Sequence, residues 1–88
     1  MTDYIQIYFC LTDGQYNHLT VQHKLILDYI AAFGSITPME AFTELGITKL
    51  ATRISEMRTI GVHFDQAYEG RENRFGRKVR YMRYRKAA

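Results

Sequence analysis

The sequence predicts an α+β domain in which three short helices form the core and a β-hairpin follows them, with one extra strand at the N-terminus. Between residues 20 and 61, three segments with apolar residues at helical spacing each begin after a threonine and end at a glycine. After Gly61 the apolar residues instead alternate with polar ones, which is typical of a half-buried strand. With 88 residues the chain can build one core. We expect an N-terminal strand and turn over residues 1–19 and the main domain over residues 20–88.

Residues 4–11 are rich in strand-forming residues, and at period two Ile5, Ile7 and Phe9 would share one face. A strand this apolar needs a partner, because an unpaired edge invites association. We therefore expect it to join the sheet of the hairpin and to present Tyr4 and Tyr8 on the outer face. A second copy could bury that face, which predicts a homodimer through the N-terminal strand. The next three residues, 12–14, predict a turn.

The first helix is expected from Val21 to Phe33, with Thr20 as its N-cap and Gly34 at its end. Its buried stripe would follow the i, i+3, i+4 pattern. The residues in that stripe are Leu25, Ile26, Tyr29, Ile30 and Phe33.

The second helix has the clearest local signal in the chain. Thr37 caps it, Pro38 takes the first helical position and Glu40 completes a capping box. The helix is short and is expected to end near Leu45, with Met39, Phe42 and Leu45 facing inward.

The third helix is expected to begin after Thr48 as N-cap and to run to about Ile60. The turn before it is longer than in a strict helix-turn-helix, because the apolar positions arrive two residues late. Its core stripe comprises Leu50, Ile54 and Met57. The hairpin then pairs a strand that includes Val62 and Phe64 with a second strand over residues 79–85.

Most of the basic charge lies at the C-terminus. Residues 1–70 carry four basic and eight acidic side chains, whereas residues 71–88 carry eight basic side chains and one acid. A block of this kind attracts a polyanion, and the alternative is a solubilising tail.

The order of helices, tight turn and hairpin resembles the small winged helix-turn-helix proteins that are common in bacteriophages and prophages. The resemblance covers about residues 20–86. It is carried by the stretch 34–42, the stretch 44–48, Arg53-Ile54, Met57-Arg58, Gly61 and the closing Arg-Tyr-Met-Arg-Tyr-Arg.

This resemblance implies binding of double-stranded DNA, with the third helix in the major groove and the hairpin, or wing, against the backbone or the minor groove. The implied role is that of a transcription regulator, an excisionase-like factor or a replication accessory protein. The DNA-binding residues expected on the third helix are Thr48, Lys49, Thr52, Arg53 and Ser55. Those expected on the wing are Arg71, Arg74, Arg77, Lys78, Arg80, Arg83 and Arg85.

Several of these residues have structural alternatives. Arg53 and Arg58 flank the core stripe, and they could pair with Glu40, Glu44 or Glu56 while their stems cover the core. Tyr81 is expected to pack inward. The alternative function is a module that binds a host protein, through the polar face of the third helix or by strand addition at residues 4–11.

Enzyme chemistry is not expected. The three histidines and the single cysteine, Cys10, lack metal-site spacing, and no glycine-rich phosphate loop follows a strand. The sequence therefore predicts no catalytic residues, no metal and no cofactor. No apolar run approaches the length of a membrane helix, and one cysteine cannot form an internal disulfide. We expect a cytoplasmic protein in a bacterial host cell, with no membrane partner.

Overall fold

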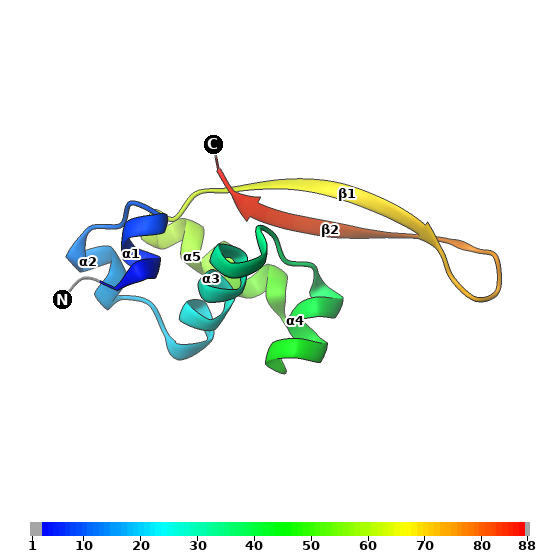
Figure 1. Cartoon of the computed structure of the whole chain (residues 1–88), viewed down its shortest axis with the longest axis horizontal. Helices are drawn as coiled ribbons and strands as arrows, with labels where there is room; N and C mark the ends of the chain where they lie inside the picture. The colour runs from blue at the N-terminus through cyan, green and yellow to red at the C-terminus, as the bar shows by residue number, and fades with distance from the viewer. Residues whose placement is uncertain (1–2, 88) are drawn as a thin grey trace.

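The computed structural model describes residues 3–87, which form a helical body and a long β-hairpin that projects from it (Figure 1). The helices are α1 (Tyr4–Tyr8), α2 (Asp13–Asn17), α3 (Val21–Phe33), α4 (Pro38–Leu45) and α5 (Leu50–Ile60). The strands are β1 (Phe64–Glu72) and β2 (Lys78–Lys86), which pair in antiparallel fashion. The α+β architecture of three core helices and a C-terminal hairpin is therefore confirmed.

Helices α3 and α4 have the predicted bounds. Thr20 and Thr37 each close a reciprocal capping box, with His23 and Glu40 respectively at the third helical position. Helix α5 differs at its start, because Lys49 rather than Thr48 is the N-cap residue and no side chain caps the helix. Four residues, 46–49, separate α4 from α5. This length lies within the three- to four-residue range of an ordinary helix-turn-helix, so the expectation of a longer turn was wrong.

The N-terminal strand predicted over residues 4–11 is wrong, because this segment forms helix α1 and a coil. The Asp3 carboxylate accepts a hydrogen bond from the Ile5 amide at 2.9 Å, which caps the helix. Helical spacing then places Ile5 and Phe9 on one face, and both are buried in the core. Burial of these two side chains in the core therefore outweighs the strand propensity of the segment. The homodimer was expected to form through this strand, and the strand is not present.

The turn predicted at residues 12–14 is instead the start of α2. Thr12 and Gln15 form a capping box around the first turn of this helix. Cys10, between α1 and α2, has a left-handed backbone with φ of 56°, and the Leu11 amide donates to the Gln6 carbonyl at 2.9 Å. This arrangement ends α1 and turns the chain back, so that Leu11 is also buried.

The hairpin is joined to the helical body at its base and is free at its tip. Phe64 pairs with Lys86 at the base, and Glu72 pairs with Lys78 next to the loop. Near the base, Tyr84 also forms an isolated bridge with Ile36, which lies between α3 and α4. The wing overhangs the body on the side of α4, and the molecule measures 49 × 25 × 22 Å (Figure 1).

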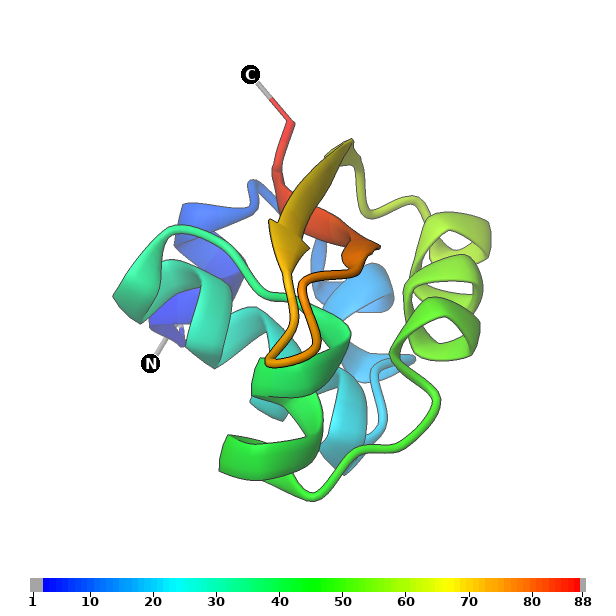
Figure 2. The same ribbon diagram turned by 90° about the vertical axis from the view of Figure 1, so that its right-hand side faces the viewer.

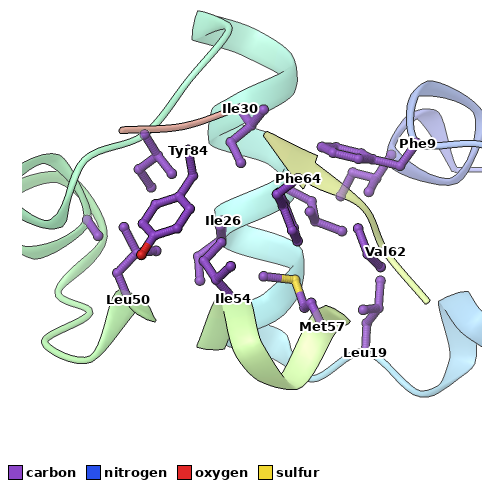
Figure 3. Close-up of a cluster of buried hydrophobic side chains, with 14 of the residues drawn as sticks. Phe9, Leu19, Ile26, Ile30, Leu50, Ile54, Met57, Val62, Phe64 and Tyr84 are labelled. Atoms are coloured by element: carbon purple, nitrogen blue, oxygen red, sulfur yellow. The ribbon is translucent and has the colours of Figure 1, made fainter. Parts of the chain in front are cut away.

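The core lies between α3, α5 and the base of the hairpin, and α1 closes it on one side (Figure 3). Ile54 and Met57 of α5 point toward Ile26 of α3, and Phe64 and Tyr84 cover them from the hairpin. Ile30 and Leu50, from the predicted helical stripes, are buried as well, and so are Ile47 and Val62.

Part of the expected core is on the surface. Leu25, Phe33 and Phe42 are exposed, and so is Met39. Helix α3 buries a face rotated from the predicted one, which consists of His23, Ile26, Leu27 and Ile30. The reason is the position of its partners, because α1 and α5 both pack against α3 on this face.

Candidate nucleic-acid interface

The basic residues expected on the wing are concentrated in its distal half. The structure places Arg71 at the end of β1 and Lys78 at the start of β2, so both lie in the strands and not in the loop. Arg74 and Arg77 do lie in the loop. All four side chains are exposed, as are those of Arg80 and Arg85 on β2. The distal wing therefore presents cations along both strands and at the tip.

Arg83 differs from the other wing arginines because its guanidinium is held by the protein itself. Its Nε donates to Glu69 at 2.6 Å, and its Nη1 donates to the Ser35 hydroxyl at 2.8 Å and to Glu40 at 3.4 Å. The hydrogen bond from Arg83 lowers the pKa of Glu69, and the same bond raises the pKa of Arg83. Arg83 thus ties the wing to the start of α4.

Two further wing cations lie over aromatic rings. The Arg80 guanidinium lies 4.6 Å from the centre of the Tyr68 ring, and the Lys86 ammonium lies 5.2 Å from that of Tyr8. Both cations remain exposed, so they can also reach a phosphate. Tyr81, expected to pack inward, is half-buried and faces α4.

The loop at the tip of the wing contains a feature that the sequence reasoning missed. Phe75 has 81% of its surface exposed, between the two loop arginines. Asn73 and Gly76, on either side of it, are residue types that favour turns. Phe75 stands among turn residues, where no side chain is expected to face the core. An aromatic residue at such a position is the pattern that could have identified Phe75 from the sequence.

The exposed face of α5 is polar and nearly uncharged. Thr52, Ser55 and Thr59 are all exposed on it, and Lys49 and Thr48 are exposed just before the helix. Hydroxyl groups can hydrogen-bond to bases or phosphates. Figure 2, viewed toward the tip of the wing, shows α5 on one side of the hairpin and α4 lower down and behind the tip.

Glu56, one turn after Thr52 on α5, reaches α3 through His23 and also pairs with Arg53. Arg53 Nη1 is 3.2 Å from Glu56 Oε1, as in the structural alternative proposed for this residue. The same carboxylate oxygen accepts from His23 Nε2 at 2.9 Å, while His23 Nδ1 accepts from the Thr20 amide at 3.1 Å. The Arg53 guanidinium therefore offsets the negative charge that Glu56 places next to the polar face.

Arg58 connects the end of α5 to the wing. Its Nη2 donates to Gln66 Oε1 at 2.7 Å and to the Phe64 carbonyl at 3.4 Å. The structural alternative for Arg58 was a carboxylate partner, and the structure gives it an amide and a backbone carbonyl instead.

A groove runs between the start of α4 and the underside of the wing, with a volume of about 1130 Å³. Its apolar lining comes from Met39, Phe75, Val79 and Tyr81. Its basic lining comes from Arg71, Arg74, Arg80 and Arg83.

Charge divides the molecule into two parts. Residues 3–63 carry four basic and six acidic side chains, whereas the wing residues 64–86 carry eight basic and three acidic ones. Within residues 3–87, no group of three or more histidine, cysteine or acidic side chains is placed to hold a metal ion. Across the same residues, no helix combines the length and apolarity needed to cross a membrane.

Comparison with known proteins identifies the domain. A family model described as a winged helix-turn-helix domain matches residues 21–85. No curated protein and no solved structure matches the chain. The matched residues include α3, α4, α5 and nearly all of the hairpin, and the bridge between Ile36 and the wing completes the sheet. The chain belongs to the winged helix-turn-helix domain family, whose fold is a DNA-binding one.

Proposed function

We propose that this protein binds double-stranded DNA with the distal wing on the phosphate backbone and the polar face of α5 against the bases. The observation that carries the proposal is the separation of charge, because the helical body is slightly acidic and the projecting wing is strongly basic. Cations on an extended arm reach phosphates that the acidic body would repel.

The wing provides affinity and α5 provides the means of selection. Phosphate contacts from Arg71, Arg74, Arg77, Lys78 and Arg80 carry no sequence information. Lys49, Thr52 and Ser55 are the side chains on or beside α5 that can read base edges. Because α5 has few cations of its own, affinity depends on the wing.

The biological role we propose is that of a phage- or prophage-type regulator acting in the cytoplasm of a bacterial cell. A transcription regulator, an excisionase-like factor and a replication accessory protein would each use a small duplex-binding domain of this kind. A homodimer could not form by strand pairing at residues 4–11, because Tyr4–Tyr8 form a helix and Ile5, Phe9 and Leu11 are buried within one chain.

A salt titration of binding to random duplex DNA tests the function. The five exposed cations of the distal wing imply a slope of log K against log salt near −4.5, from about 0.9 per phosphate. Affinity should then fall roughly several hundredfold between about 50 and 200 mM salt. Absence of duplex binding at low salt would contradict DNA binding.

A second candidate function is binding of a host protein, and the groove beneath the wing favours it. An acidic segment with apolar side chains would match the lining of apolar residues and arginines. Met39→Ala, at the start of α4, should weaken binding of such a segment and leave duplex binding unchanged. Strand addition at residues 4–11 no longer supports this function, because those residues form no strand.

A further inference from the structure

Phe75, at the tip of the wing, has the largest exposed fraction among the large apolar side chains of residues 3–87, at 81%. Its ring stacks on no other aromatic ring within this part of the chain. Exposing a phenyl ring to water is unfavourable and adds nothing to the core. Val21 and Phe33 are also largely exposed, but only Phe75 lies at the tip of the basic hairpin.

The loop that carries Phe75 is held in one shape by Asn73. The Asn73 side-chain oxygen accepts from the amides of Phe75 at 2.9 Å and Arg77 at 3.1 Å. The Asn73 amide donates to the Arg77 carbonyl at 2.8 Å, and the Gly76 amide donates to the Asn73 carbonyl at 3.0 Å. Gly76 has φ of 74°, a conformation that suits glycine. Phe75 is thus presented on an ordered turn, so binding loses little conformational entropy there.

The surroundings of Phe75 favour nucleic acid as the partner. Arg74 precedes it, Arg77 and Lys78 follow shortly after, and no acidic residue lies between Glu72 and the C-terminus. An apolar side chain bracketed by cations fits a ligand with stacked apolar bases between two rows of phosphates. Arginines are also drawn into the minor groove, where the negative potential is enhanced.

The dimensions fit the minor groove. Arg83 makes the outermost hydrogen bonds between wing and helices among residues 3–87, and five residue pairs of the hairpin lie beyond it. At about 3.4 Å per residue, these pairs extend roughly 17 Å. The minor groove is about 7.5 Å deep and about 6 Å wide, so the paired strands are too wide to enter but the side chains of the tip can. Figure 1 shows this tip projecting past the helical body on the side of α4.

We propose that Phe75 is a wedge that enters the minor groove, inserts between two base pairs and bends the duplex. This inference rests on the proposed DNA binding and adds an activity to it. Apolar wedges of this kind unstack a base step and kink DNA toward the major groove. Pyrimidine–purine steps unstack most easily, so the wedge should favour duplexes that place such a step opposite the tip.

Phe75→Trp provides a direct reporter, because the chain contains no tryptophan. If the ring stacks on bases, its fluorescence should be strongly quenched on addition of a 25-base-pair duplex. Phe33→Trp is the matched control, because Phe33 is 72% exposed at the end of α3, away from the wing tip. Its emission should change little at saturation. Equal emission changes in the two variants would overturn the wedge.

Energy transfer between dyes at the two duplex ends measures the bend. The unaltered protein should bring the ends together, and Phe75→Ala should leave the duplex straight with roughly five- to twentyfold weaker binding. The salt slope should not change, because no charge is lost. Its thermal unfolding should match that of the unaltered protein, since Phe75 is exposed.

The outcomes separate the two proposals. Tight binding of duplex without a bend overturns the wedge and leaves the proposed function intact. Absence of duplex binding at low salt overturns both. A bend that Phe75→Ala still produces would assign bending to the arginines and overturn the role of Phe75.

Discussion

Ile36 and Tyr84 exchange two backbone hydrogen bonds, each 2.9 Å from nitrogen to oxygen. Ile36 lies in the link between α3 and α4, and Tyr84 lies in β2, so the bonds join the wing to the helical body. Both side chains are buried, and Tyr84 lies against the same cluster as Ile26 and Leu50 (Figure 3). The direction of the wing is therefore set by the core, and not by the hairpin alone.

Tyr84→Ala should cost about 3–5 kcal/mol of unfolding free energy, because it removes a buried aromatic ring and leaves a cavity. Tyr68→Ala is the control, because Tyr68 lies on the same face of the hairpin but is 65% exposed. Its cost should be below about 1 kcal/mol. Urea denaturation followed by circular dichroism measures both, and equal costs would contradict the anchoring role of Tyr84.

Asp3→Asn should make stability less dependent on pH in acid. Asp3 accepts hydrogen bonds from the Ile5 amide and, at 2.8 Å, from the Tyr16 hydroxyl, and these bonds lower its pKa below 3.8. A lowered folded-state pKa stabilises the protein above the unfolded pKa, and this stabilisation is lost as the pH falls through the folded pKa. The variant should therefore be less stable at pH 7, and the difference should disappear toward pH 2.

Thermal unfolding across this pH range gives the comparison for Asp3. Asp28→Asn is a suitable control, because Asp28 is exposed and makes no side-chain hydrogen bond or ion pair among residues 3–87. A pH-independent difference for Asp3→Asn would show that its carboxylate does not stabilise α1 through charge.

Neutralising Arg77, Lys78 and Arg80 together should weaken binding to all duplexes about equally. The salt slope should become shallower by up to about three units, since each lost phosphate contact removes nearly one. Arg83→Gln should leave the slope almost unchanged and lower stability instead, because Arg83 is bound by Glu69, Ser35 and Glu40. Fluorescence anisotropy at several salt concentrations decides this, and an unchanged slope in the triple variant would refute binding by the wing.

Changing Lys49 or Thr52 should alter which duplexes are preferred. These residues lie at the exposed start of α5, where side chains can contact base edges. Selection of bound sequences from a random pool should give a shifted or weakened consensus for Lys49→Ala and Thr52→Ala, with the salt slope changed by at most about one unit. Lys24→Ala, on α3 over Tyr16, is the control and should leave the consensus intact. An unchanged consensus in both α5 variants would exclude base reading by this helix.

Local signals in the sequence determined the elements of the winged domain. The Thr37-Pro38-Met39-Glu40 signature and the glycines after each helix act within one turn of backbone, so they work without tertiary contacts. The change of period after Gly61 likewise predicted the hairpin, and β1 and β2 follow it. The concentration of basic residues near the C-terminus of the sequence also predicted that the cations lie on the wing.

The tertiary structure alone decided the form of the N-terminus and the use of individual charges. Residues 4–11 have strand propensity, but helix α1 lets Ile5 and Phe9 reach the core together, and no strand partner is needed. Arg83 and Arg77 look alike in the sequence, yet Arg83 is held by Glu69, Ser35 and Glu40 while Arg77 is exposed in the loop. Propensity and composition describe a residue by its neighbours in the chain, whereas burial and ion pairing depend on residues that only folding brings together.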